Sequence, residues 1–121
     1  MDYTDDNAPI DWTDLISLYW INITTKVPEE AWIYAILYKD NESQHIFYVW
    51  QTDNLKKQLL EHISSNEPNE CLNQKIRYYR CYFKYTKISL QKERDDCKAL
   101  LLRKYWRDLC KEVNSSENSS I

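Results

Sequence analysis

The side chains that could do chemistry are few in this chain, and they lie far apart in the sequence. There are only two histidines, His45 and His62, and Glu93, Asp95 and Asp96 form a close group of carboxylates. Imidazoles can exchange protons with water, and carboxylates can hold a divalent cation. No His-Glu-x-x-His motif occurs, and a chain without glycine has no glycine-rich phosphate loop. A catalytic site would therefore have to be assembled by the fold from distant segments.

The four cysteines allow more than one chemistry. They are widely spaced and include no Cys-x-x-Cys pair. A disulfide framework or a zinc site stays open, but free buried thiols in a reducing compartment are the favoured interpretation. The residues concerned are Cys71, Cys81, Cys97 and Cys110.

The overall composition indicates one folded domain. The 121 residues are 43% hydrophobic and 29% charged, with a formal net charge of −3. No apolar run approaches the roughly 20 residues that cross a bilayer, and the acidic start MDYTDDNAPID is unlike a secretory signal. We therefore expect an intracellular, cytoplasmic protein without a membrane partner, and a nuclear location stays open.

Charge is distributed unevenly along the chain. Residues 74–107 carry eleven Lys or Arg against three acids, a net of +8, and the remainder carries five against sixteen, a net of −11. Such asymmetry can mark a nucleic-acid surface. The favoured alternative is that a basic strand and helix pair with the acidic ends of the same domain.

The strongest secondary-structure signal is a pair of apolar runs. Trp32–Tyr38 (WIYAILY) and His45–Trp50 (HIFYVW) are rich in aromatic and β-branched residues, and the short polar link between them predicts an antiparallel hairpin. Thr52 or Asp53 then caps a helix in which apolar residues recur every four positions. This part of the chain should therefore form the centre of the fold.

The later segments complete a small domain. Residues 64–70 read as a loop, and Arg77–Tyr85 alternates as a third strand. Ser89 can cap a last helix from about Leu90 to Val113. Together these features predict an α+β fold, with a small antiparallel sheet of about three strands flanked by helices.

Residues outside this core are expected to be less ordered. The N-terminal region should contain a helix over Trp12–Ile23 that Asp11 caps. The final residues NSSENSSI are polar and should fray. The predicted divisions are a disordered acidic start (1–10), an N-terminal helical extension (11–27), the main domain (28–113) and a flexible tail (114–121).

The order of these elements and several short motifs resemble the GIY-YIG nuclease domain. WIY at residues 32–34 stands where that family has Gly-Ile-Tyr, and YVW at residues 48–50 stands where it has Tyr-Ile/Val-Gly. The dipeptide at residues 93–94, ahead of an apolar helix, resembles the segment that carries the family's metal ligand. The resemblance covers about residues 28–110 and implies that the main domain is GIY-YIG-like.

Enzymes of this family cut DNA, and the resemblance implies which groups would do so here. It implies a tyrosine or histidine base, an arginine on the phosphate and a glutamate that holds one divalent metal. Tyr34 and Tyr48 occupy the two tyrosine positions. His62 lies four residues beyond the arginine position, on the same helix face. These three residues are the retained catalytic candidates.

Five other positions depart from the family pattern. Gln58 puts a neutral amide at the arginine position, and Lys98 replaces the glutamate with an ammonium group that cannot ligate Mg²⁺. Trp32 and Trp50 stand at the two glycine positions beside the substrate groove, where Trp50 either plugs the groove or packs in the core. Cys110 stands where asparagine is common. We therefore expect a catalytically inactive domain without a metal or cofactor.

An inactive domain of this kind would serve as a binding or regulatory module. The favoured partner is a protein in DNA processing or defence, and a homodimer is a further possibility. Exposed aromatic residues and an acidic start suit protein contacts. The aromatic residues expected at the surface are Trp12, Tyr19, Trp20 and Trp106.

Two alternatives stay open. One is a nucleic-acid-binding module without cleavage, in which Lys98 receives a phosphate instead of pairing with Glu93 or Asp95. The other is a divergent endonuclease that binds Mg²⁺ through a displaced carboxylate such as Asp95 or Glu61. The candidate nucleic-acid ligands are Arg77, Arg80, Lys84, Lys87 and Lys98, with Tyr78 and Tyr82 as stacking residues.

Overall fold

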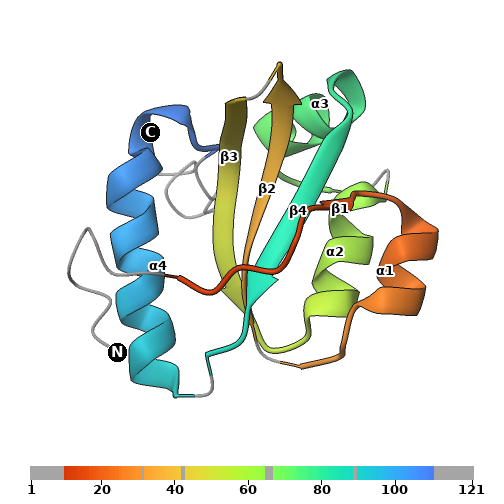
Figure 1. Cartoon of the computed structure of the whole chain (residues 1–121). Coiled ribbons are helices and arrows are strands. Elements are labelled where there is room, and N and C mark those ends of the chain that lie inside the picture. Colours follow the sequence, from red (N-terminus) through yellow and green to blue (C-terminus); the bar gives the residue numbers. More distant parts are fainter. Residues whose placement is uncertain (1–9, 31, 42, 65–66, 89, 111–121) are drawn as a thin grey trace.

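The chain folds into a four-stranded antiparallel sheet with helices on both of its faces (Figure 1). The computed structural model describes residues 10–30, 32–41, 43–64, 67–88 and 90–110. The predicted α+β class is confirmed, with one strand more than the three expected. In chain order the elements are β1 (Ile16–Ser17), α1 (Trp20–Lys26), β2 (Trp32–Asp40), β3 (Ser43–Thr52), α2 (Leu55–Ile63), α3 (Glu70–Tyr78), β4 (Cys81–Thr86), α4 (Gln91–Tyr105) and a 3₁₀ turn at Trp106–Asp108.

The sheet is built around the predicted hairpin of β2 and β3. Its strand order is β1-β4-β2-β3, and Tyr34 of β2 is paired with Trp50 of β3. The register shifts after Ile36, so Phe47 is the extra residue of a β-bulge. The Phe47 carbonyl accepts a hydrogen bond from the backbone N–H of Cys110, with an N–O distance of 2.6 Å. The bulge therefore fixes the end of the described chain against β3.

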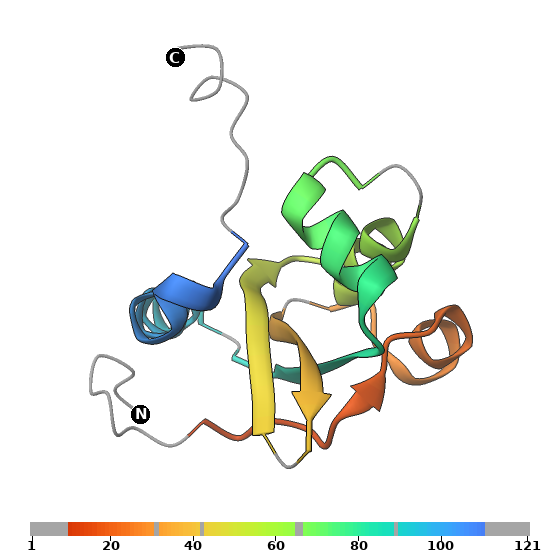
Figure 2. The same ribbon diagram turned by 90° about the horizontal axis from the view of Figure 1, so that it is seen from above.

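Two apolar clusters hold the helices onto the sheet. On one face α2 and α3 contribute Leu55, Leu59 and Leu72, which pack with aromatic residues of the strands. On the other face α4 contributes Cys97 and Leu101. Figure 2 shows α4 by itself on one side of the sheet and the other three helices on the opposite side. Because successive side chains of a strand point to opposite faces of the sheet, the same strands contribute to both clusters.

The N-terminal helix begins later than the sequence predicted. Asp11 caps no helix, and α1 starts only at Trp20. The backbone amides of Thr13 and Leu18 donate hydrogen bonds to two β4 carbonyls, each at 2.9 Å. Backbone pairing with an open sheet edge therefore replaces the helix that the apolar spacing suggested.

Helix α3 was not predicted, and it occupies the unassigned residues between the predicted loop (64–70) and the strand predicted from Arg77. The Asn69 side chain caps it by accepting a hydrogen bond from the Leu72 amide at 3.1 Å. The strand β4 begins at Cys81 rather than at Arg77. From that point the predicted alternation of more and less buried residues is confirmed. The prediction failed because the alternating residues before the strand belong to the end of a short helix.

The caps of the two predicted helices also differ from expectation. Asn54, and neither Thr52 nor Asp53, caps α2, and its side chain accepts a hydrogen bond from the Lys57 amide at 3.1 Å. Helix α4 ends at Tyr105 and is followed by the 3₁₀ turn, so it is shorter than predicted. The predicted cap at residue 89, the start (1–9) and the tail (114–121) lie outside the described residues.

The interpretation of four free thiols is wrong for two of the cysteines. Cys71 and Cys110 form a disulfide, with their Cα atoms 5.6 Å apart. It ties the start of α3 to the chain after α4. Cys81 and Cys97 are free and buried, and burial raises the pKa of each thiol to about 11. The pairing was missed because residues 39 positions apart meet only in the folded chain.

Candidate functional site

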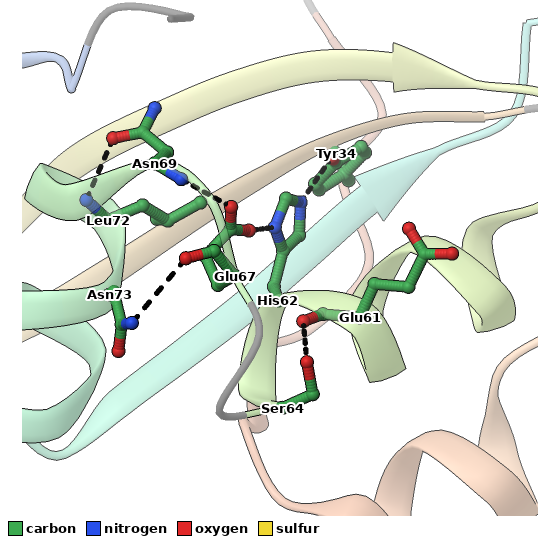
Figure 3. Close-up of polar contacts among 8 residues, drawn as sticks. All are labelled: Tyr34, Glu61, His62, Ser64, Glu67, Asn69, Leu72 and Asn73. Carbon is green, nitrogen blue, oxygen red and sulfur yellow. Dashed lines mark hydrogen bonds and ion pairs between the residues drawn. The ribbon is translucent and has the colours of Figure 1, made fainter.

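The fold brings the three retained catalytic candidates together. Tyr34, Tyr48 and His62 come from β2, β3 and α2. The Tyr34 hydroxyl and His62 Nε2 form a hydrogen bond of 2.7 Å (Figure 3). The Tyr48 ring meets the imidazole edge-on, with 5.1 Å between ring centroids. Sequence reasoning therefore selected residues that the fold assembles.

A fourth residue, Glu67, completes this group and was not foreseen. Its carboxylate pairs with His62 Nδ1 and accepts a hydrogen bond from the Asn69 backbone amide at 2.8 Å (Figure 3). Burial favours the neutral acid, but the hydrogen bonds from His62 and Asn69 outweigh it and lower the pKa of Glu67. In a neutral imidazole, Nδ1–H then donates to Glu67, and Nε2 accepts from the Tyr34 hydroxyl. Glu67 lies in the connection before α3, where the sequence offered no signal beyond polarity.

The sealed cluster is defined as Tyr34, Tyr48, His62 and Glu67; the first three have almost no contact with solvent, and Glu67 is partly buried. Tyr34 is 0% exposed, and Tyr48 and His62 are each 3% exposed. A general base must come within about 3 Å of the proton that it removes. In this arrangement the hydroxyl and imidazole atoms face one another and not an open surface. The hydrogen bonds instead satisfy buried polar groups and hold His62 in one orientation.

The two substituted positions Trp50 and Lys98 contact each other. Lys98 Nζ lies 4.1 Å from the centroid of the Trp50 ring, which is within cation–π range. Trp50 belongs to outer strand β3 and packs against the cluster covered by α2 and α3, whereas Lys98 belongs to α4. The contact therefore joins α4 to the outer edge of the sheet. Trp50 lies against the core, and its partly buried ring is covered by the lysine.

The carboxylates that could replace a metal ligand are engaged otherwise or stand alone. Asp95 is exposed and accepts hydrogen bonds from the side-chain amides of Gln51 and Gln91, at 2.8 and 2.9 Å. These two bonds lower the pKa of Asp95. Glu61 is exposed at the end of α2. Among the described residues, no three His, Cys, Asp or Glu side chains gather closely enough to hold a metal ion.

The other three positions that depart from the pattern of the resembled family are Trp32, Gln58 and Cys110. Trp32 stands edge-on to Tyr85, with 4.9 Å between centroids, and its buried indole N–H has no hydrogen-bond partner among the described residues. Gln58 is half-buried on α2. Cys110 is committed to the disulfide. Among the described residues, none of these three side chains makes a recorded polar contact with the sealed cluster.

The predicted nucleic-acid ligands have different surroundings, and three of the five are engaged by other residues of the chain. Lys84 lies over the Trp12 ring at 4.9 Å, where burial and then nearby Lys104 lower its pKa. Lys87 pairs with Glu30 at 3.3 Å. Lys98 covers Trp50, as described above. Arg77 and Arg80, by contrast, are exposed where α3 passes into β4.

The aromatic residues expected at the surface divide three to one. Tyr19, Trp20 and Trp106 are 60%, 59% and 54% exposed. Trp12 is half-buried beneath Lys84. Ile21, which was not singled out, is 48% exposed and makes the run at residues 19–21 continuous.

Comparison with known proteins gives no further guide to the site. The chain matches no protein-family model, no curated protein and no solved structure. Within the described residues, no helix has the length and apolar character needed to cross a membrane.

Proposed function

We propose that this chain is a catalytically inactive GIY-YIG-like domain that acts as a binding or regulatory module. The main support is the sealed cluster, because Tyr34, Tyr48 and His62 are buried and the Tyr34 hydroxyl and the His62 imidazole are hydrogen-bonded within the cluster. The order of hairpin, helix, strand and long helix from β2 to α4 agrees with the order that suggested the resemblance. Helix α3 is an addition to that order.

The contact between Trp50 and Lys98 supports loss of cleavage. In the proposed alignment these residues replace a glycine beside the groove and the metal-binding glutamate. The indole fills space that glycine would leave open, and the ammonium group has no lone pair to offer a cation. The two replacements act together, because the bulky ring and the positive charge stabilise each other.

The partner that we propose is another protein. Tyr19, Trp20 and Ile21 form a continuous exposed run, and large aromatic side chains are common anchors of protein interfaces. Helix α1 carries one cation, Lys26, and Tyr19 at its start also lines a hollow with Arg80, so the apolar side chains of the run and not its charge favour a protein. A partner in DNA processing or defence is the one that a GIY-YIG-like scaffold suggests, and a second copy of the chain is the simplest case.

A nicking assay tests the absence of cleavage. Purified protein incubated with supercoiled plasmid and Mg²⁺ or Mn²⁺ should give no nicked product above the buffer control. The matched variant is Tyr34→Phe, which removes the hydroxyl and keeps the ring. Nicking that disappears in a well-folded Tyr34→Phe protein overturns the proposal. Nicking of equal strength in wild type, Tyr34→Phe, Tyr48→Phe and His62→Ala identifies a contaminating nuclease.

Sedimentation over a wide range of protein concentration tests the simplest partner. Self-association that weakens when Trp20→Ser and Ile21→Ser are combined assigns the exposed run to a second copy. A monomer at every concentration excludes the homodimer and leaves a different protein as the occupant. The control pair Lys56→Gln and Lys57→Gln lies on α2 and should change neither result.

A further inference from the structure

A column of three stacked rings and a fourth ring set edge-on extends from the sheet to the surface, at the end of β2 beyond Tyr34. His45 stacks on Tyr38 with 4.8 Å between centroids, and Tyr38 stacks on Tyr79 at 3.8 Å with the ring planes 1° apart. Tyr79 meets Tyr78 edge-on at 4.8 Å. Tyr78 is 81% exposed. This open column, defined as His45, Tyr38, Tyr79 and Tyr78, ends in a ring with free surface.

Two rings of the open column, Tyr78 and Tyr79, belong to a strongly basic segment of the chain. Residues 71–88 contain five Lys or Arg and no Asp or Glu. Lys75 Nζ lies 5.8 Å from the Tyr79 centroid. Arg77 Nε donates to Asn73 Oδ1 at 2.7 Å, which orients the guanidinium and leaves its other N–H groups for a ligand. The ion pairs found in the described chain involve none of Lys75, Arg77 and Arg80.

Three hollows follow the column and share residues, so they form one strip. The first has a volume of about 550 Å³ and is lined by Lys75, Arg77 and Tyr78. The second, also about 550 Å³, shares Tyr79 with the first and adds Arg80. The third, of about 340 Å³, shares Lys75 with the first. The described lining of all three includes four cations and one acid, which are Lys75, Arg77, Arg80, Arg107 and Asp108.

We propose that this strip binds an unpaired nucleic-acid strand. Proteins that bind single strands without sequence preference combine a basic groove for phosphates with exposed rings on which bases stack. Tyr78 provides the exposed ring, and Arg77 and Arg80 provide donors suited to phosphate oxygens. The site lies apart from the sealed cluster and needs no cleavage chemistry.

The exposed ring at the end of the open column favours an unpaired strand over other anionic ligands. An acidic peptide would engage the cations and make no use of the free face of Tyr78. A double helix keeps its bases stacked within the duplex, so Tyr78 could contact only its backbone. An unpaired strand is the ligand that uses both the charge and the rings.

Fluorescence anisotropy with the full chain and a labelled oligothymidylate tests the proposal. Binding should weaken as salt is raised, and Tyr78→Ala should weaken it about tenfold, whereas Tyr78→Trp should retain it. The slope of log affinity against log salt concentration changes by roughly 0.7 for each phosphate contact with a single strand. Combining Arg77→Gln with Arg80→Gln should therefore reduce the steepness of this slope by about 1.4. Combining Lys56→Gln with Lys57→Gln on α2 makes the same change in charge and should leave binding unchanged.

Four results would overturn the proposal. They are no binding at the lowest salt concentration, equal binding of a duplex of the same length, competition by polyglutamate as effective as that by unlabelled strand, and an equal loss in the α2 control. Because Tyr78 is exposed, its variants should fold, and a circular dichroism spectrum that matches wild type makes each result interpretable. The nicking assay has no bearing on the outcome.

Discussion

The sealed cluster and the open column are built from the same residue types and differ in what surrounds them. Each contains tyrosines and one of the two histidines, and both start on β2, where Tyr34 and Tyr38 are four residues apart. In the sealed cluster polar atoms of Tyr34, His62 and Glu67 are paired with one another, and the rings are almost unexposed. In the open column three rings stack in series, and the fourth meets them edge-on and reaches solvent.

The comparison shows that residue type alone does not identify a functional site. Glu67, from the connection before α3, pairs with His62 and leaves no polar atom of the imidazole free for a substrate. The junction between α3 and β4 leaves Tyr78 uncovered. A buried polar chain of this kind contributes to stability, whereas an exposed ring beside cations is available to a ligand.

Loss of the Cys71–Cys110 disulfide, which holds α3 next to Tyr79, should reduce stability more than any other change considered. Replacing Cys71 and Cys110 together with serine should lower the free energy of unfolding by about 4 kcal/mol, because the disulfide closes a loop of 39 residues. Chemical denaturation measures the loss. Amide hydrogen exchange in the variant should increase more in α3 than in α2. An equal increase in both helices would show that the disulfide does not stabilise α3 in particular.

The two histidines allow a direct comparison of the two regions. His62→Ala removes one partner of a buried pair and should lower the free energy of unfolding by about 3 kcal/mol. His45→Ala removes one ring from a stack at the surface and should cost less than about 1 kcal/mol. Urea unfolding of both variants provides the test. Equal losses would remove the distinction between the sealed cluster and the open column.

Acid should destabilise the chain through the sealed cluster. The pKa of Glu67 is lowered from its ordinary value of 4.5, so its contribution to stability is complete above that pH and is lost as the pH falls through the lower, folded-state value. The free energy of unfolding of Glu67→Gln should therefore depend less on pH across this range than that of wild type. Unfolding curves measured from neutral to acidic pH supply the comparison, and parallel profiles would contradict it.

The smallest expected effect is at the exposed end of the open column. Tyr78→Ala should change the free energy of unfolding by less than about 0.5 kcal/mol, because its ring is 81% exposed. The same substitution should weaken oligothymidylate binding. A loss of stability comparable with that of His62→Ala would show that Tyr78 supports the fold.

Local sequence patterns were sufficient for the centre of the fold. The aromatic and β-branched runs identified the hairpin, and the four-residue apolar repeat identified α2. The resemblance to a known family selected Tyr34, Tyr48 and His62, and the fold brings these residues into contact. These features were accessible because each depends on periodicity within a segment or on a motif read in order.

Features that depend on long-range contacts could not be predicted from the sequence. Strand β1 has two residues and exists because it pairs with β4. The Cys71–Cys110 disulfide and the pairing of Glu67 with His62 join segments whose approach no local pattern encodes. The contact of Lys98 with Trp50 likewise depends on where α4 lies beside β3. The sequence identified which residues were unusual and not which residues they would meet.

The chemical reactivity of the two histidines is the decisive test of whether the sealed cluster is closed to substrate. The native chain, treated with diethyl pyrocarbonate and analysed by mass spectrometry, should be carbethoxylated at His45, and His62 should react only after unfolding. This follows because His62 is 3% exposed and has both ring nitrogens engaged. If His62 reacted as fast as His45 in the folded chain, its imidazole would be open to substrate, and the proposed loss of catalysis would be contradicted.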